Sequence, residues 1–256
     1  ALTEANEVFC WGDNSEGQLG LPTSTARSER PVKVDVPADV SSLVAGAFHT
    51  CVVTTNFEAF CWGRNACGQL GAGNEAPNPS PTPRKVLPPV GGQHLQFTAI
   101  APGLDHTCAL EAGGATYCWG CNTHGQAGGL GSAGATDLPA NAGTDNQNAV
   151  AIATNETHTC IIGTGKAHVR CWGTETRGAL GNGPPESETM TTSVLAETGG
   201  EMTAIALGSR HTCGLDANRT VACWGDNSMG QLGNPDAGEM LTAPESRVLV
   251  EQAQAV

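Results

Sequence analysis

One short motif occurs five times along this chain of 256 residues. Each copy begins Cys-Trp-Gly and runs into a glycine-rich turn, as in CWGDNSEGQLG, and successive copies are 51, 57, 53 and 52 residues apart. All five tryptophans of the chain lie in these copies, which begin at Cys10, Cys61, Cys118, Cys171 and Cys223. A period near 50 residues is typical of solenoids, arrays and propellers. The repeat predicts a single domain over residues 1–256, made of five repeats of about 51–57 residues.

A second motif, His-Thr-Cys, precedes four of the copies, and its cysteine lies 10 or 11 residues before the next Cys-Trp-Gly. The segments between, such as residues 110–116, read as hairpin loops. Antiparallel neighbours approach to about 4.5 Å, which lies within the Cα separation that a disulfide needs. Free buried thiols are the alternative. Four repetitions at nearly constant spacing favour bridges, and we predict Cys51–Cys61, Cys108–Cys118, Cys160–Cys171 and Cys213–Cys223.

Three cysteines lie outside this pairing. Cys67 and Cys121 occupy turns of consecutive repeats, which neighbouring units bring close together, so we predict a Cys67–Cys121 bridge; two free surface thiols are the alternative. Cys10 then remains unpaired. Aligning ALTEANEVFCWG with CALEAGGATYCWG places Ala1 directly after the cysteine that would pair with Cys10. We therefore expect His-Thr-Cys to precede Ala1 in the parent sequence, and this chain to be a processed or partly observed piece.

Each repeat contains four strand-like pieces. A small apolar strand such as residues 43–45 suits a crowded innermost position, and the residue after it predicts a left-handed backbone. His-Thr-Cys and Cys-Trp mark the second and third strands, and Pro-flanked pieces such as residues 31–34 and 248–250 read as an outer edge strand. The residues expected to be left-handed are Gly46, Gly103, Asn155 and Gly208.

Two stretches between the repeats diverge from one another, residues 72–97 and 129–149. They are rich in Pro, Gly, Asn and Ala and resemble irregular surface loops. Loops on a rigid scaffold are where binding usually resides, and the alternative is that they are passive insertions.

Composition excludes some classes of partner. The formal net charge is −13, and only 12 residues are Lys or Arg. Such a chain lacks the positive surface that binds phosphate backbones and is repelled by anionic membrane surfaces, so we expect no nucleic acid. No apolar run of about 18 residues is present, so we expect no membrane insertion. Eleven cysteines in a bridge-like pattern indicate an oxidising compartment, so we expect an extracellular, cell-surface or periplasmic protein.

The combined pattern, VAxGxxHTCAL followed by Cys-Trp-Gly-x-Asn-x-x-Gly-Gln-Leu-Gly, resembles the regulator-of-chromosome-condensation repeat. The Gly-Gln-Leu-Gly turn is intact at residues 17–20, 68–71 and 230–233. The resemblance implies an all-β propeller of four-stranded antiparallel blades, about five of them visible. Because members of the family usually close with seven blades, an arc of a seven-bladed propeller is the alternative. The fourth repeat departs from the pattern, with Glu175 in the place of Asn and Ala179 in the place of Gln. The paired cysteines indicate a secreted, disulfide-bearing branch.

Several residues of the repeats are candidates for metal binding or glycosylation. One histidine per repeat suggests a metal ring, but equivalent positions around a propeller lie too far apart to share one zinc ion. Each histidine is therefore better explained as forming a hydrogen bond with a neighbouring strand or turn. Asp13 and Asp226 lack the spacing of a calcium loop and are better explained as turn-initiating residues. Asn155 and Asn218 fit the short glycosylation pattern. The four histidines are His49, His106, His158 and His211.

No nucleophile elbow, His-Glu-x-x-His or phosphate-binding loop is present, so we expect no enzyme, cofactor or metal. The sequence favours an extracellular protein-interaction scaffold that binds a partner through its divergent loops, like the secreted β-lactamase inhibitors of this propeller class. A glycan-binding, lectin-like module is the alternative, and scarce aromatic residues argue against it. A hydrolase or an exchange factor ranks below both. The residues that bind remain unassigned.

Overall fold

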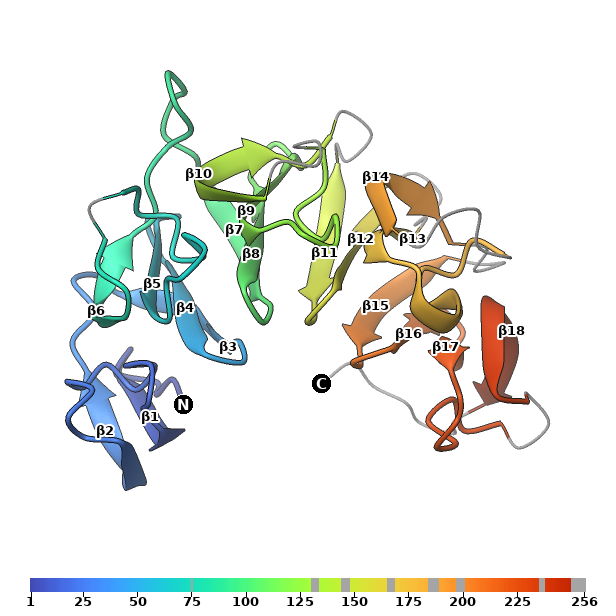
Figure 1. The fold of residues 1–256 in the computed structure, drawn as a ribbon, viewed down its shortest axis with the longest axis horizontal. Coiled ribbons are helices and arrows are strands. Elements are labelled where there is room, and N and C mark those ends of the chain that lie inside the picture. The colour runs from blue at the N-terminus through green and yellow to red at the C-terminus, as the bar shows by residue number, and fades with distance from the viewer. Residues whose placement is uncertain are drawn as a thin grey trace. The chain divides into compact units, whose positions relative to one another are not determined.

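The computed structural model describes residues 1–74, 76–129, 134–143, 148–164, 169–183, 189–196, 201–234 and 238–249. In these ranges every regular element is a β-strand, apart from one 3-10 turn, η2 (Thr176–Gly178). The strands form five sheets, four of them four-stranded, and all the pairings between them are antiparallel (Figure 1). The all-β architecture of four-stranded blades is therefore confirmed. Within these ranges no helix has the length and apolar character that a membrane span requires.

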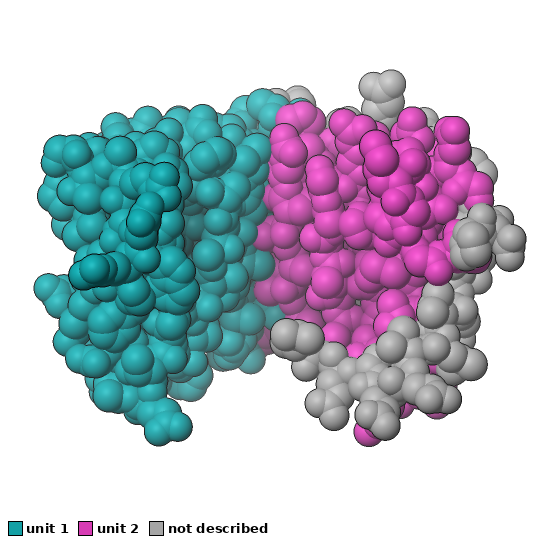
Figure 2. Space-filling view, turned by 90° about the horizontal axis from the view of Figure 1, so that it is seen from below, with its two compact units in different colours: residues 1–112, 117–123, 133–141 teal, residues 113–116, 124–132, 142–256 magenta. Residues whose placement is uncertain are grey.

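The chain divides into two compact units, which are coloured separately in Figure 2. One unit comprises residues 1–112, 117–123 and 133–141, and the other comprises residues 113–116, 124–132 and 142–256. The single domain expected from the repeat stays a prediction.

The first unit holds three sheets. The first sheet is two-stranded, whereas the second and third have four strands in the order β3-β4-β5-β6 and β7-β8-β9-β10. The bounds are β1 (Val8–Asp13), β2 (Arg27–Val34), β3 (Val40–Ala45), β4 (His49–Thr54), β5 (Ala59–Gly63), β6 (Ser80–Lys85), β7 (Phe97–Pro102), β8 (His106–Glu111), β9 (Thr116–Cys121) and β10 (Ala135–Asn141).

The second unit holds two sheets of four strands, each in sequential order. Their bounds are β11 (Ala149–Thr154), β12 (His158–Gly163), β13 (Val169–Thr174), β14 (Thr189–Leu195), β15 (Met202–Leu207), β16 (His211–Asp216), β17 (Thr220–Asp226) and β18 (Met240–Leu249). In each four-stranded sheet the small apolar strand comes first, then His-Thr-Cys, then Cys-Trp-Gly, then the outer strand, which is the order that the sequence predicts.

The centre of each four-stranded sheet is a cystine, and seven of the eight cysteines involved, all but Cys213, are buried. The cysteine of each His-Thr-Cys strand is bonded to the Cys-Trp-Gly cysteine opposite it, with Cα atoms 4.1–4.2 Å apart. All six side chains of β4 are buried, because both faces of this second strand pack against neighbours. These are the four hairpin pairs that the spacing predicts. They join the apolar side chains in one core, as Cys51 and Cys61 do with Val53, Leu70 and Trp119.

Consecutive blades are joined through one backbone carbonyl and the groups that donate to it, a contact that we call the joint. The carbonyl oxygen of Gln69, in the Gly-Gln-Leu-Gly turn, accepts a hydrogen bond from the Trp119 indole at 2.9 Å and another from the Thr107 hydroxyl at 2.7 Å. Gly71 follows at a φ of 66°, and a Cβ there would lie 2.7 Å from the Trp119 nitrogen, so only glycine fits under the indole. In the other blades the equivalent indole and threonine hydroxyl donate to the carbonyls of Gln18, Gln126 and Ala179.

The repeated histidines extend this joint. His49 Nε2 lies 2.8 Å from Thr107 Oγ1, and because that hydroxyl donates its proton to Gln69, the imidazole is the donor. His158 and Thr212 repeat the contact at 3.1 Å. Burial lowers the pKa of both histidines to about 3, so both are neutral at physiological pH. At these positions the histidine bonds to the neighbouring strand, and the described residues contain no group of three or more His, Cys, Asp and Glu placed to hold a metal.

The divergent stretches are not wholly irregular. Residues 72–97 contain β6, and residues 129–149 contain β10, so each supplies the outer strand of its blade. The expectation of loops throughout was wrong at these segments. A strand that pairs along one edge only tolerates proline, and β6 contains two, which gives it the composition of a loop.

The residues after the innermost strands are not left-handed, which corrects the expectation for Gly46, Gly103, Asn155 and Gly208. Close packing explains the glycine instead: a Cβ on Gly46 would lie 2.7 Å from the carbonyl oxygen of Gly103 in the next blade. At Asn155 a side chain is accommodated because its amide donates to the carbonyl of Gly208.

We predict that Thr107→Val destabilises the protein more than Thr50→Val does. Both changes remove the bond to a turn carbonyl, but only Thr107→Val also leaves a buried imidazole N–H, that of His49, without an acceptor. An orphaned buried donor costs about 1–3 kcal/mol and a lost hydrogen bond about 1 kcal/mol. Urea unfolding with disulfides intact measures the difference. Equal losses for the two variants would contradict the His–Thr–carbonyl chain.

Candidate interaction site

The two divergent stretches meet at one polar pocket in the first unit. We call it the loop pocket; its volume is about 380 Å³, and it lies between the second blade's turn, the segment after that turn, and the start of β10. The amide of Gly73 donates to the carbonyl of Asp137 at 3.1 Å, which joins the two stretches directly. The lining residues are Asn65, Ala66, Cys67, Gly68, Gly73, Asn74, Ala76, Ala135 and Asp137.

Asn65 fixes the shape of the turn that forms one wall of the loop pocket. Its side-chain oxygen accepts the amide of Leu70 at 3.2 Å, and its side-chain nitrogen donates to the carbonyl of Ala76 at 3.3 Å. The backbone amide of Asn65 donates to the side chain of Asn78 at 2.9 Å. The turn has the same length in every repeat of the chain, whereas the segment after it varies. These hydrogen bonds hold the two together, so the wall of the pocket is preformed.

A disulfide fastens the same turn to the next blade. Cys67 is bonded to Cys121, at the end of β9, with Cα atoms 5.1 Å apart. This is the pair proposed from the turn positions. Beside it, Gly68 has a φ of 79°, and a Cβ there would lie 2.5 Å from the Cα of Asp137. The bridge and this close approach together hold β10 against the turn.

The loop pocket offers an unengaged carboxylate. In the described part of the chain no hydrogen bond or ion pair engages the side chain of Asp137, which is only partly buried. Asn74 lines the same pocket and adds an amide group, whereas the amide of Asn65 is engaged by Leu70 and Ala76. A carboxylate flanked by amides suits a cationic or hydrogen-bond-donating side chain from a partner.

The segment between β6 and β7 carries exposed apolar side chains. Val90 is 90% exposed and Leu87 is 41% exposed. The segment extends away from its sheet in Figure 1. Leu87 is also near the loop pocket, because its Cδ1 would lie 3.4 Å from a Cβ built on Gly73, a lining residue. Exposed apolar side chains beside a polar pocket are the combination that protein interfaces use.

The acidic residues weighed as calcium ligands serve their own turns. Asp13 Oδ2 accepts the hydroxyl of Ser15 at 2.6 Å and the amide of Gln18 at 2.7 Å, and these hydrogen bonds, that from Ser15 foremost, lower its pKa. Asp226 accepts from Ser228 in the same way and pairs with Arg177 at 3.3 Å. Of the two glycosylation patterns, Asn155 has its amide engaged by His158 and Gly208, whereas Asn218 is exposed.

The fourth turn contains a buried carboxyl group where the others have an amide. Glu175 Oε2 accepts the amide of Leu180 at 3.1 Å, but Oε1 is buried without a hydrogen-bond partner. In the first turn, the amide nitrogen of Asn14 donates at the corresponding place to three carbonyls. A carboxylate has no proton to donate, and burial raises the pKa of Glu175 to about 7. Ala179 is tolerated nearby because the joint uses only its backbone carbonyl.

The sequence did not reveal the loop pocket. It indicated both stretches and the Cys67–Cys121 pair, but not that Gly73, Asn74 and Ala76 share a pocket with Ala135 and Asp137. The signal that was present is the disulfide itself, since a bridge between two turns also brings together the segments that follow them.

A family model described as RCC1-like domain matches residues 1–255. Among curated proteins, human HERC4, a probable E3 ubiquitin-protein ligase, is 37% identical over 130 residues, which are 50% of this chain and 12% of HERC4. The ultraviolet-B receptor UVR8 of Arabidopsis thaliana is 31% identical over 231 residues, 89% of this chain and 50% of UVR8. The chain therefore spans at most half the length of these two relatives.

Solved structures show the same fold. Human WBSCR16 superposes with a TM-score of 0.85 at 24% identity, over 97% of this chain and 64% of that one. Yeast RCC1 (Prp20), solved bound to Kap60, superposes with a TM-score of 0.76 at 24% identity, over 96% of this chain and 58% of that one.

We predict that replacing both Cys67 and Cys121 with serine loosens the loop pocket without unfolding the blades. The bridge spans 54 residues, and a cross-link of that span contributes at most about 4 kcal/mol. Limited proteolysis should cleave residues 72–79 faster in the variant, while the four hairpin bridges survive on mass mapping. Unchanged cleavage would show that the turn is held without the bridge.

We predict that stability falls between about pH 5 and pH 8 because of Glu175. Its pKa is higher in the folded protein than in the unfolded chain, so the folded state binds the proton more tightly and loses stability as the pH rises through about 7. Glu175→Gln removes this dependence and stabilises the protein at pH 8 by about 1–3 kcal/mol. Urea unfolding at both pH values measures it, with the exposed Glu4→Gln as the control. A pH dependence unchanged in Glu175→Gln would exclude this carboxyl group.

Proposed function

Because this chain belongs to the RCC1-like domain family, we propose that it is an extracellular interaction module that binds a protein partner through its divergent loops. Members of this family bind other proteins, as the structure of Kap60 bound to yeast RCC1 (Prp20) illustrates. The observation that carries the proposal for this chain is that both divergent stretches meet at the loop pocket, near the exposed side chain of Leu87.

The five disulfides support the proposed location. They indicate an oxidising compartment, since cytosolic reductants keep most such thiols reduced. The extracellular space, the cell surface and the bacterial periplasm are the compartments of this kind, and we place the protein there.

Charge supports a partner with a basic segment. The chain carries a formal net charge of −13, and Asp137 presents a carboxylate in the loop pocket. An acidic surface speeds the approach of a cationic partner and repels an anionic one. Leu87 and Val90 would then supply apolar contacts beside the charged one, as the core and rim of an interface do.

A glycan-binding module receives less support. Sugar rings stack on aromatic faces, and among the described residues the large aromatics that are exposed are Trp11 and Phe57. Neither lines the loop pocket. We also propose no catalytic role: the relatives named as ligases extend far beyond the segment that this chain matches.

We predict that Leu87→Ser/Val90→Ser and, separately, Asp137→Asn abolish or weaken partner capture while the fold is retained. Removal of whole stretches is unsuitable, because it also deletes β6 or β10. Val150→Ser is the matched control, since Val150 is 62% exposed but lies in β11, outside the loops. Disulfide-intact protein is immobilised and exposed to native extracellular fluid, and the bound proteins are quantified for each variant.

The outcomes separate the alternatives. Proteins retained by the parent and by Val150→Ser but lost from both loop variants support the proposal, and their capture should weaken as salt rises. Proteins captured equally by all variants would remove the loops from consideration. Binding on a glycan array that survives both loop variants would favour the lectin-like alternative.

A further inference from the structure

The Cys67–Cys121 bridge differs from the four hairpin bridges in its exposure. Seven of the eight hairpin cysteines are buried, whereas Cys67 and Cys121 are both partly exposed. Cys67 also lines the loop pocket, so a reductant can approach the bridge from there. Exposed disulfides are the ones that thiols reduce, whereas buried ones resist attack. This bridge therefore combines access to a reductant with a place in the wall of the proposed binding site.

The two kinds of bridge also differ in what holds their cysteines together. A hairpin pair such as Cys213 and Cys223 lies at opposite positions of two antiparallel strands, so the ladder keeps the sulfurs adjacent after reduction and the bond re-forms readily. Cys67 and Cys121 are 54 residues apart, in a turn of one blade and at the end of β9 in the next. Their reduced form gains more freedom, which favours reduction of this bridge over the others.

Reduction would act on the loop pocket and leave the blades joined. Gln69 and Trp119, which form the joint through a hydrogen bond of 2.9 Å, each lie two residues from a cysteine of the bridge. On the other side of the bridge, Ala135 of β10 is opposite Cys121, and both Ala135 and Cys67 line the pocket. The bridge is therefore the covalent link between the joint and the wall of the pocket.

The contacts that remain without the bridge are weaker than a covalent link. The amide of Gly73 donates to the carbonyl of Asp137 at 3.1 Å, and Gly68 packs closely against the same residue. One hydrogen bond and one packing contact open more often than a cross-linked segment does. The wall that carries Asn65 and Asn74 would then separate more often from the carboxylate of Asp137.

We propose that the Cys67–Cys121 bridge is a redox switch for the loop pocket. A dithiol reduces it while the hairpin bridges persist, the pocket opens, and a bound partner is released. The inference rests on the proposed function for the role of the site, but the reduction and the opening can be measured without a partner.

The reduction is a thiol–disulfide exchange in two steps. A thiolate of the dithiol attacks the Cys67 sulfur, a mixed disulfide forms, and the Cys121 sulfur leaves as a thiolate that takes up a proton. The second thiolate of the reductant then displaces the Cys67 sulfur, which is protonated in turn. The dithiol is oxidised to a disulfide and the bridge is reduced to two thiols, so the electrons and protons balance.

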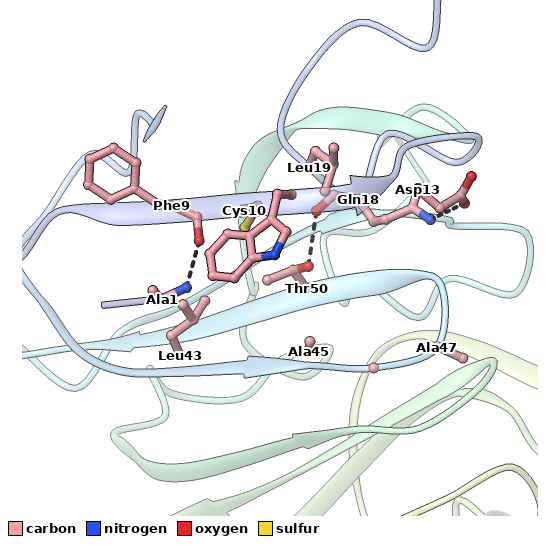
Figure 3. Close-up of a pocket in the computed structure, with 12 residues that line it drawn as sticks. Ala1, Phe9, Cys10, Asp13, Gln18, Leu19, Leu43, Ala45, Ala47 and Thr50 are labelled. Atoms are coloured by element: carbon pink, nitrogen blue, oxygen red, sulfur yellow. Dashed lines mark hydrogen bonds between the residues drawn. The ribbon is translucent and has the colours of Figure 1, made fainter. Parts of the chain in front are cut away.

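Dithiothreitol tests the proposal on the intact, folded chain. Cys10 is the one free cysteine and lies in a separate pocket beside Leu43 and Thr50 (Figure 3), so its thiol is first blocked with N-ethylmaleimide. After timed reduction without denaturant, the new thiols are trapped with iodoacetamide and mapped by mass spectrometry. We expect Cys67 and Cys121 to be labelled at least about tenfold faster than any hairpin pair.

Cys213–Cys223 is the matched control among the hairpin bridges. Cys213 is also partly exposed, but it is held opposite its partner by a strand pair. Labelling of Cys213 and Cys223 as fast as that of Cys67 and Cys121 would show that exposure alone decides reduction, and would overturn the switch. No labelling of Cys67 and Cys121 would overturn it as well.

Hydrogen exchange measures the opening of the pocket. We expect the backbone amides of residues 65–74 to exchange at least about fivefold faster after reduction, while β4 and β5 are unchanged. The double variant Cys67→Ser/Cys121→Ser should exchange fast with or without dithiothreitol, which excludes an effect of the reductant elsewhere. Reduction of the bridge without faster exchange would overturn the opening.

Partner capture tests the consequence and separates this inference from the proposed function. Proteins that the oxidised chain captures from native extracellular fluid, and that the loop variants lose, should be released by reduction and recaptured after reoxidation. Their retention on the reduced chain would overturn the switch. Capture of no such protein by the oxidised chain would overturn the proposed function instead, while labelling and exchange still decide whether the bridge opens the pocket.

Discussion

A single kind of carbonyl oxygen holds consecutive blades together. In the first four turns the carbonyl of the second residue accepts one hydrogen bond from an indole and one from a threonine hydroxyl of the next blade, so both of its lone pairs are used. At Gln69, Gln126 and Ala179 these hydrogen bonds are buried, where an unmade hydrogen bond costs more than a made one contributes. The joint therefore fixes the spacing of Trp and His-Thr-Cys in the repeat.

This dependence explains which departures the repeat tolerates. Ala179 replaces a glutamine without harm to the joint, because the backbone makes the contact. Glu175 is different, because it replaces an amide whose N–H groups donate to loop carbonyls, and it leaves one buried oxygen without a partner. The consequence is a buried carboxyl group whose pKa is raised to about 7.

The same logic separates structure from function in this chain. The residues that recur in every repeat include histidines and aspartates that suggest metal sites. Those described above form hydrogen bonds within turns and joints instead. The side chains of Asp137, Leu87 and Val90 take part in none of these turns and joints, and they lie where the repeats diverge. Loops on a rigid scaffold are where binding residues are usually found.

The sequence by itself determined the strand order within each blade, the four hairpin cystines and the place of Cys67 beside Cys121. It could do so because period, spacing and strand alternation are local properties of the chain. It misjudged β6 and β10 because an outer strand pairs along one edge only, and proline-rich segments such as β6 are then indistinguishable from loops. It also attributed Gly46 to backbone conformation, when the cause is a neighbouring carbonyl 2.7 Å away. Only the tertiary structure decided that the two divergent stretches form one pocket and that the acceptor of the His49 imidazole is Thr107 of the next blade. Both facts concern which atoms of different blades meet, and such contacts arise from packing, which no repeat period encodes.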